Sequence, residues 1–370
     1  MRVGEDGVRP VHVGEKPGPL GAGVAHRRSR PTLREVAEAA GVSPMTASYV
    51  YSQPGRVAPA TAAKVRAAAE RLDYPGPHPG ARSLRRGRAG SLGVVMSERL
   101  TYAFDDPQAA RFLAGVAEVC ADEETGLTLV PTTGAGSDVL RVAEAVVDGF
   151  IVWTTSEDDP ALDAVVATRR PAVVQAGPGR PGLPVVGIDE RAAAVAIGRL
   201  AFAGAARPVV LSFPANRDRA RQLLSGLPDA SVTYSLTRRR WEGLFDAWRE
   251  VGGAPDDLRV AVCQANATGL GEAFAGELFR DDPPDAIAAM SDELALGALR
   301  AAARAGLAVP GDVAVTGWDD TDAAAPAGLS TVRQSLRDQG RRCAHIALGH
   351  DLPAGLDPPG WEVVERTSTR

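Results

Sequence analysis

The chain has 370 residues, of which 45% are hydrophobic and 24% are charged, an ordinary balance for a globular protein of two or three domains. Its net charge of −5 hides an asymmetry: residues 1–90 contain 15 Lys and Arg against 7 Asp and Glu, whereas the remainder contains 26 against 39. A basic segment on an acidic body is typical of a small nucleic-acid-binding module attached to a larger domain. No apolar run approaches the roughly 20 residues that cross a bilayer, so we expect no membrane span.

The first 30 residues contain no recognisable element. They are rich in Gly, Pro and Arg and lack the apolar segment of a secretory signal. We interpret residues 1–30 as a disordered extension, or as the product of a misassigned upstream start codon.

Three cysteines, Cys120, Cys263 and Cys343, lie far apart and lack the short spacing of a zinc site or a redox motif. This usage predicts reduced, structural thiols in a cytoplasmic protein. Five scattered histidines form no metal-binding pattern either, so we expect neither a metal nor a cofactor.

The segment TLREVAEAAGVSPMTASYVY predicts two short helices joined by a tight turn. Thr32 can cap the first helix, with Glu35 three residues later completing a capping box. Gly41 is typical of the left-handed residue that ends a helix. Ser43 and Pro44 then suit the cap and first turn of a second helix. Two helices around such a turn form a helix-turn-helix unit, whose second helix enters the major groove of DNA.

A third helix is predicted over Pro59–Leu72, followed by the proline- and arginine-rich segment YPGPHPGARSLRRGR and by SLGVVM, a buried strand of a new domain. The segment between them has no apolar face to bury, so it is interpreted as a linker. The predicted organisation is an extension at 1–30, a helix-turn-helix domain at 31–74, a linker with a hinge helix at 75–90, and a larger domain at 91–370.

Several motifs in a fixed order resemble one known family. They are T-L-x-E-V-A-x-A-A-G-V-S at 32–43, Val57 to Val65, Leu72 with Tyr74, Ala81-Arg82-Ser83-Leu84, MSDELALGALRAA and VTGWDDT. On these motifs, residues 31–370 resemble the lactose-repressor (LacI/GalR) family of transcription regulators. The resemblance implies a DNA-binding repressor whose affinity for its operator is controlled by a small-molecule effector.

Beyond the linker, short apolar runs alternate with Ala-rich amphipathic segments, a pattern that predicts doubly wound parallel sheets. The resemblance implies two such sheets, arranged as the bilobed periplasmic-binding-protein fold, with a ligand in the cleft at the carboxyl ends of the strands. The predicted strands are Leu92–Met96, Leu127–Pro131, Gly149–Trp153, Ala172–Gln175, Val185–Ile188, Pro208–Ser212, Arg259–Cys263, Ala286–Met290 and Val313–Thr316. The predicted helices include Gln108–Glu123, Ala192–Ala203, Arg239–Glu250 and Glu293–Ala305.

By resemblance, Pro44, Met45 and Tyr49 fall on the three positions through which family members choose their operators. Pro44 and Met45 offer only apolar contact, for example with a thymine methyl, and Tyr49 cannot make the bidentate contact of Arg or Asn. We therefore expect an operator unlike those of the best-known members. Ser43 and Thr46 are assigned to phosphates, which position the helix without specifying sequence.

The linker is expected to fold as a hinge helix only when bound to DNA, because its prolines and Gly80 make a poor helix alone. By resemblance, Leu84 wedges between the central base pairs from the minor groove, and Ala81 and Arg82 are further residues of this minor-groove hinge. Nearby arginines would neutralise phosphates. The spacing from Tyr74 to Ala81 is one residue longer than is usual in the family, which leaves the hinge geometry open.

For the effector pocket, the resemblance assigns Arg240 as the arginine that clamps the ligand and Asp319 as the acceptor of its hydrogen bonds. Further candidates are Ser291, Asp292, Asp189 and Gln334. Two departures stand out: Asp106-Pro107-Gln108-Ala109 replaces an Asn-Pro followed by two aromatics, and Leu336 replaces a stacking aromatic. The aromatics that could stack a ligand instead are Tyr102, Phe104, Trp153 and Trp318. A sugar is the expected ligand by family.

Two other functions are less consistent with the sequence. The Gly-rich TTGAGSD lacks the pattern of a phosphate-binding loop, and the chain has no recognisable nucleophile motif, which argues against a doubly wound enzyme. A solute-binding protein of the same bilobed fold would need a secretion signal and no helix-turn-helix. We therefore expect a homodimer on a palindromic operator, in which the ligand closes the cleft and alters hinge-helix pairing.

Overall fold

The computed structural model describes residues 31–76, 88–96, 101–227 and 229–370. The described residues form two compact units, one over 31–76 and one from residue 88 onward. The predicted extension 1–30 and the predicted hinge contacts Ala81, Arg82 and Leu84 lie outside the described residues. None of the described helices is long and apolar enough to cross a membrane.

The smaller unit contains three helices and a short 3-10 turn: α1 (Leu33–Ala40), α2 (Pro44–Ser52), η1 (Pro54–Arg56) and α3 (Pro59–Arg71). The helix caps predicted for α1 and α2 are present. Thr32 and Glu35 form the capping box of α1, and Gly41 ends this helix with a φ of 66°. Ser43 caps α2 by accepting a hydrogen bond from the backbone N–H of Thr46, at 3.0 Å. The helices enclose a small core of Val36, Ala37, Ala47, Val50, Ala62, Val65, Ala68 and Ala69.

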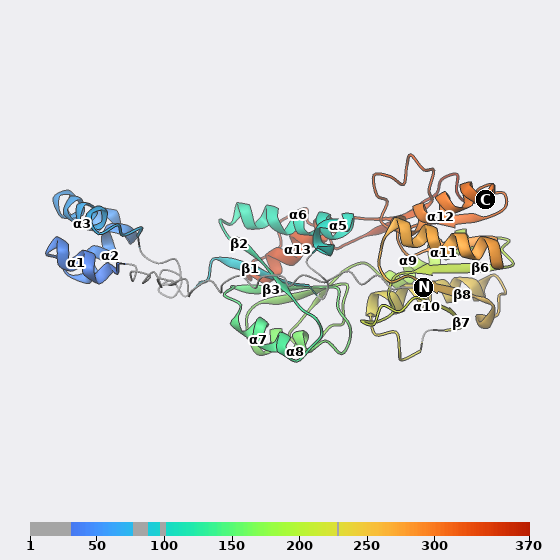
Figure 1. The fold of residues 1–370 in the computed structure, drawn as a ribbon, viewed down its shortest axis with the longest axis horizontal. Coiled ribbons are helices and arrows are strands. Elements are labelled where there is room, and N and C mark those ends of the chain that lie inside the picture. The colour runs from blue at the N-terminus through green and yellow to red at the C-terminus, as the bar shows by residue number, and fades with distance from the viewer. Residues whose placement is uncertain (1–30, 77–87, 97–100, 228) are drawn as a thin grey trace, which may run out of the picture. The chain divides into compact units, whose positions relative to one another are not determined.

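The larger unit has two lobes, each a sheet with helices on both faces (Figure 1). The N-lobe comprises the described residues of 88–188 together with 335–350. Its sheet is parallel throughout, in the order β2-β1-β3-β4-β5. The strands are β1 (Ser91–Met96), β2 (Gly126–Pro131), β3 (Gly149–Trp153), β4 (Ala172–Gln175) and β5 (Val185–Val186). Helices α6 (Pro107–Asp122) and α13 (Leu336–Leu348) cover one face, and α7 (Ser137–Glu144) and α8 (Pro160–Ala167) lie over the other, while α5 (Tyr102–Asp105) precedes α6.

The C-lobe comprises the described residues of 189–334 together with 361–370. Its sheet has the order β10-β9-β6-β8-β7, with β6 (Pro208–Ser212), β7 (Gln222–Ser225), β8 (Arg259–Val262), β9 (Ala286–Ala289) and β10 (Ala314–Thr316). Helices α9 (Glu190–Ala201) and α10 (Ser235–Glu250) pack on one face. Helices α11 (Thr268–Asp281) and α12 (Asp292–Ala305) pack on the other, and the 3-10 turn η2 (Pro255–Asp257) precedes β8.

The bilobed fold of two doubly wound sheets is confirmed, with two differences in detail. The edge strand β7 runs antiparallel to β8, so the second sheet is mixed. A separate antiparallel pair, β11 (Thr331–Gln334) and β12 (Trp361–Val364), was not predicted. The chain crosses between the lobes after β5, after β11 and after α13. These crossings bring Gln334 and Leu336 to the boundary between the two lobes.

Three helix pairs pack through matched glycines. A Cβ on Gly115 of α6 would lie 2.0 Å from the carbonyl oxygen of Arg337, and one on Gly340 of α13 would lie 2.2 Å from that of Phe112. Glycine therefore lets the two helix backbones approach each other more closely than any other residue would allow. Gly271 and Gly297 let α11 and α12 approach in the same way, and Gly243 of α10 faces the carbonyl oxygen of Arg191 on α9, whereas Gly198 of α9 makes room for the Ala247 side chain.

Candidate functional site

The second helix of the small unit exposes an apolar edge at its first turn. Pro44 is exposed and Met45 is 65% exposed, whereas Ala47 and Val50 are buried in the three-helix core. A large apolar side chain in water is unfavourable unless another molecule covers it. The side chains of Pro44 and Met45 are therefore accessible to a partner at the first turn of α2.

Two further contacts organise this helix. Tyr49 is half-buried, and the guanidinium of Arg56 from η1 lies 5.6 Å from the centre of its ring, within the range of a cation–π contact. The hydroxyls of Ser43 and Thr46 lie 2.9 Å apart and are hydrogen-bonded. The arginine thus stands beside the tyrosine ring on the same surface as the first turn.

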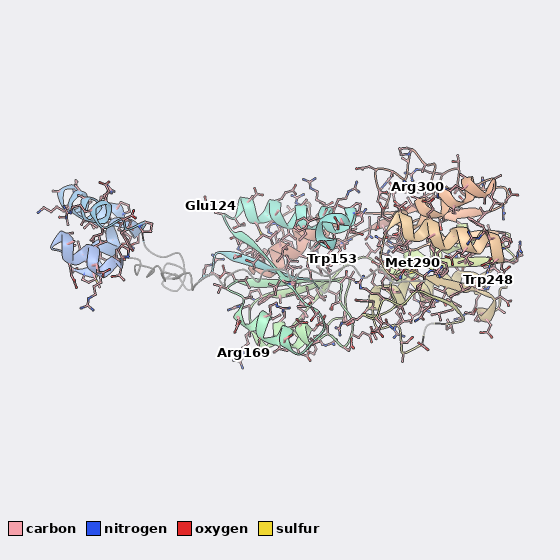
Figure 2. The ribbon with its side chains drawn as sticks, viewed as in Figure 1. Glu124, Trp153, Arg169, Trp248, Met290 and Arg300 are labelled. Carbon is pink, nitrogen blue, oxygen red and sulfur yellow. The ribbon has the colours of Figure 1, made fainter. Side chains whose placement is uncertain are left out.

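A pocket of about 100 Å³ lies between the two lobes of the larger unit, at the carboxyl ends of several strands. Trp153, at the end of β3 in the N-lobe, lines this pocket; Met290, just after β9 in the C-lobe, does not line it (both are labelled in Figure 2). From the N-lobe it is lined by Asp106, Gln108, Trp153, Thr154, Gln175, Ala176 and Leu336. From the C-lobe it is lined by Glu190, Phe213, Pro214, Arg219, Tyr234, Leu236, Thr237, Arg240, Asn266, Asp319 and Gln334.

Arg240 is held rigidly at the wall of this pocket. Its Nε donates to Glu190 at 2.7 Å, and its Nη1 donates to the carbonyl oxygen of Met290 at 2.7 Å. The guanidinium also lies 4.0 Å from the ring centre of Trp318. Among the described residues, Nη2 has no hydrogen-bond partner, so one edge of the fork is available to a ligand.

Asp319 stands across the pocket in a strained conformation. Its φ of 104° lies in the left-handed region, and Thr154 and Ala176, which also line the pocket, have φ values of 21° and 48°. Strain of this kind persists where the surrounding structure imposes it, commonly at functional sites. Burial raises the pKa of the Asp319 carboxyl well above its ordinary value, although the charge of Arg240 acts in the opposite direction.

The lobes touch each other around the pocket. Asn266 of the C-lobe donates to Asp106 of the N-lobe at 2.6 Å. Arg111 on α6 pairs with Asp322 of the C-lobe, also at 2.6 Å. These contacts bridge the cleft, so the structure shows the lobes closed against each other.

Comparisons with known proteins agree with both parts of this geometry. Residues 32–76 match the bacterial regulatory proteins of the lacI family, and residues 185–369 match a periplasmic binding protein-like domain. The HTH-type transcriptional regulator Rv3575c of Mycobacterium tuberculosis is 36% identical over 327 residues, which are 87% of this chain and 91% of that protein. The chain belongs to the LacI family. It is a DNA-binding transcriptional regulator.

Solved structures show the same relationship. A LacI-family regulator from Corynebacterium glutamicum superposes with a TM-score of 0.66 and 26% identity, over 93% of this chain and 100% of that one. The transcriptional regulator CelR in complex with cellobiose gives a TM-score of 0.59 and 26% identity, over 92% of this chain and 100% of that one. The bilobed body of this LacI-family regulator therefore matches a fold that holds a small ligand in that complex.

The predicted effector residues of the regulator fall into two groups. Arg240, Asp319 and Gln334 line the pocket together. Asp189 instead caps α9 by accepting a hydrogen bond from Ala192 at 3.0 Å. Ser291 caps α12 and donates to Asn266 at 2.5 Å. Neither Asp189 nor Ser291 is among the described residues that line the pocket, so their proposed contact with a ligand stays a prediction.

Sequence reasoning missed several polar pocket residues, among them Gln108, Gln175, Glu190 and Asn266. Gln108 was noted only as a departure, yet its Nε2 is buried and has no hydrogen-bond partner among the described residues. A buried unpaired donor is costly, so a ligand acceptor is the natural partner. Asn266 could have been found from its place after a predicted strand, where pocket residues gather. Of the four suggested stacking aromatics, Trp153 lines the pocket, whereas Phe104 is 70% exposed and Trp318 is buried beside Arg240; the side chain of Tyr102 is not among those described.

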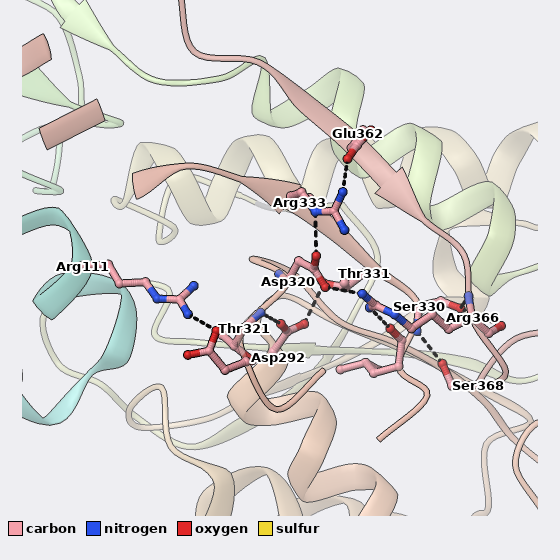
Figure 3. Close-up of polar contacts among 12 residues, drawn as sticks. Arg111, Asp292, Asp320, Thr321, Ser330, Thr331, Arg333, Glu362, Arg366 and Ser368 are labelled. Carbon is pink, nitrogen blue, oxygen red and sulfur yellow. Dashed lines mark hydrogen bonds and ion pairs between the residues drawn. The ribbon is translucent and has the colours of Figure 1, made fainter. Parts of the chain in front are cut away.

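Asp292 does not line the pocket but joins the segments behind it. Its carboxylate accepts hydrogen bonds from the backbone N–H of Thr321 at 2.6 Å and from the Thr331 hydroxyl at 2.7 Å (Figure 3). The neighbouring Asp320 pairs with Arg333 and Arg366, each at 2.7 Å or less. This network fixes the loop that carries Asp319.

Burial raises the pKa of Asp292 to about 6. The folded pKa lies above the unfolded value, so the folded state holds this proton more tightly and stability is lost as pH rises from about 4 to about 6. Relative to the variant Asp292→Asn, the free energy of unfolding of the wild type is expected to fall by up to about 1.4 kcal/mol per pH unit in this window. Urea denaturation at several pH values measures the difference. If the difference in unfolding free energy between the wild type and Asp292→Asn is constant with pH, the raised pKa of Asp292 is contradicted.

Proposed function

We propose that this LacI-family regulator is a homodimeric repressor that releases or binds a palindromic operator in response to a small neutral ligand. The observation that carries the proposal is the exposed apolar first turn of α2, with Met45 65% exposed on a helix whose other face is buried. One such helix reads too few bases for specificity, and a two-fold dimer matches a palindrome.

In this proposal Pro44, Met45 and Tyr49 contact base edges, and Ser43 and Thr46 contact phosphates. Arg56, beside the Tyr49 ring, adds a positive charge at the same surface. The hinge residues Ala81, Arg82 and Leu84 insert into the minor groove at the centre of the operator, where a flexible pyrimidine–purine step is easiest to kink.

Met45→Ala and Tyr49→Ala are each expected to weaken binding to the operator about tenfold and to leave binding to an unrelated duplex unchanged. The reason is that contacts to bases determine which DNA sequence is bound, whereas contacts to phosphates do not. The measurement is fluorescence anisotropy with operator and with scrambled duplex at one salt concentration. Glu38→Gln, an exposed change on α1, serves as the control and should leave both affinities unaltered. Equal losses of affinity for both duplexes would show that these two residues do not contact base edges.

The pocket favours a neutral, hydroxyl-rich ligand such as a sugar. Its charged lining consists of the carboxyl groups of Asp106, Glu190 and Asp319 and the guanidinium groups of Arg219 and Arg240, so no positive charge is in excess for a phosphate. The polar lining and the rings of Trp153, Phe213 and Tyr234 suit the hydroxyls and the apolar faces of a sugar. A neighbour of the same fold holds cellobiose, which supports the class of ligand.

A thermal-shift screen tests this ligand class with matched pairs of neutral sugars and their phosphates. Neutral compounds are expected to raise the melting temperature, because ligand binding to the folded state stabilises it by mass action. A response limited to the phosphorylated members would reject the neutral-ligand proposal.

We further propose a cytoplasmic location, where an operator is accessible, and no catalytic activity. The enzyme alternative would need a phosphate-binding loop or a nucleophile motif, and the sequence carries no recognisable one. The solute-binding alternative leaves the helix-turn-helix unit without a role.

A further inference from the structure

A chain of side-chain hydrogen bonds runs across the pocket from the N-lobe to the C-lobe. The Thr154 hydroxyl donates to Gln175 Oε1 at 3.1 Å, and Gln175 Nε2 donates to Gln339 Oε1 at 2.9 Å. Gln339 Nε2 in turn donates to Gln334 Oε1 at 2.9 Å. Finally, Gln334 Nε2 donates to Asp319 Oδ1 at 2.8 Å. Four of these five residues line the pocket, and Gln339 does not.

The carboxyl end fixes the direction of the chain, because the Thr154 hydroxyl can either donate or accept. When Asp319 is ionised its carboxylate only accepts hydrogen bonds, so in that state Gln334 turns its NH₂ group to Asp319 and its oxygen to Gln339. Gln339 must then donate to Gln334 and accept from Gln175. The hydroxyl of Thr154 can donate, which completes the chain without a clash of two donors or two acceptors.

Gln339 is the member that sets the orientation of the other two amides. It lies on α13, is only 1% exposed, and so has no water to replace a lost bond. The close contact of α13 with α6 through Gly340 and Gly115 leaves its helix little room to shift. Without its amide, the side chains of Gln175 and Gln334 could each rotate to exchange donor and acceptor.

We propose that Gln339 is a positioning residue of the effector pocket: it orients the amides of Gln175 and Gln334 and thereby keeps an N–H group on the Asp319 carboxylate. The inference rests on the proposed function, because it concerns the same pocket. In its ionised form Asp319 then presents its remaining lone pairs to the ligand as an acceptor, so the ligand group that meets this carboxylate is a donor, such as a hydroxyl. The pocket thus selects ligands by the direction of their hydrogen bonds as well as by size.

The orientation of Gln334 can be followed through the ionisation of Asp319. The groups that influence this carboxyl are Arg240 on α10, Asp292 on α12, Asp106 at the start of α6 and Gln334 itself. The hydrogen bond from Gln334 lowers the pKa of Asp319, so an amide that is free to rotate away raises it. Substitutions of Gln339 leave Arg240, Asp292 and Asp106 in place.

The experiment is a pH titration of tryptophan fluorescence in the full chain without DNA or added ligand. Trp318 precedes Asp319 in sequence, and the part of the signal that disappears in Asp319→Asn reports the ionisation of this carboxyl. Gln339→Leu and Gln339→Met replace the amide by side chains of similar volume. Cys343→Ala removes a buried group from the same helix outside the chain of hydrogen bonds and serves as the control.

Both Gln339 variants are expected to raise the midpoint of the Asp319 transition by at least about 0.5 pH unit, and Cys343→Ala is expected to leave it at the wild-type value. If Gln339 only fills space, Leu and Met fill the same space and the midpoint does not move, which overturns the proposal. A shift of equal size in Cys343→Ala overturns it as well. Because the titration uses neither operator nor effector, its failure leaves the proposed function standing, and a failure of the operator tests leaves this inference standing.

Discussion

Replacing Arg240 with methionine is expected to lower the free energy of unfolding by about 3–5 kcal/mol. Arg240 and Glu190 form an ion pair with 5% and 4% of their side chains exposed. Methionine fills much of the same volume but leaves the Glu190 carboxylate buried without its cation. Breaking one side of a buried pair is costly because the remaining charge has lost both its partner and its water. Chemical denaturation of the variant and the wild type at pH 7 measures the difference.

The same two helices supply a matched control. Arg199 on α9 and Glu250 on α10 form an ion pair at 2.5 Å, but 60% and 44% of their side chains are exposed. Arg199→Met should therefore cost less than about 1 kcal/mol, as is usual for a pair that water can screen. Adding Glu190→Gln to Arg240→Met should recover a large part of the loss, since it removes the orphaned charge. A cost for Arg240→Met no larger than that for Arg199→Met would refute the role of burial.

Removing the carboxylate of Asp319 is expected to weaken effector binding at least about tenfold, because a hydrogen bond to a charged group contributes about 1.5–3 kcal/mol. The variant Asp319→Ala keeps the helix-turn-helix unit intact, so its affinity for operator without effector should be unchanged. The measurement is the concentration of the most active neutral sugar from the thermal-shift screen that gives half the maximal change in operator binding.

Asp189→Ala is the control for this second prediction. Asp189 was a candidate from sequence, yet it is exposed and caps α9. Its loss should lower stability by about 1 kcal/mol, as for other helix caps, without changing the effector concentration at half response. If Asp189→Ala weakens the response to the effector and Asp319→Ala does not, the assignment of Asp319 as the acceptor of the ligand's hydrogen bond is wrong.

The strands that sequence predicted are those with a continuous apolar run. β3, β4 and β6 are buried at every residue, and their predicted bounds agree with the structure. β7 was missed because it lies at the edge of its sheet, where Gln222 and Leu223 are exposed and no apolar run marks it. β11 and β12 were missed because their pairing joins segments almost 30 residues apart in the chain, which no local pattern encodes.

The pocket was predictable only where a residue matched a family motif. Arg240, Asp319 and Gln334 were found in this way, and they do meet at the pocket. Gln339 could not be found, because its role depends on two partners that lie 164 residues before it and 5 residues before it in the chain. A lone glutamine on a helix carries no sign of such a network in the sequence.

In the proposed function, a dimer of this chain reads a palindrome through α2. The most direct test is selection of bound sequences from a random duplex library with the full chain at near-physiological salt. We expect enrichment of a palindrome with a pyrimidine–purine step at its centre, together with loss of that enrichment in Met45→Ala. Binding that enriches no sequence and merely disappears as salt rises would contradict it, because the head would then act only through its charge.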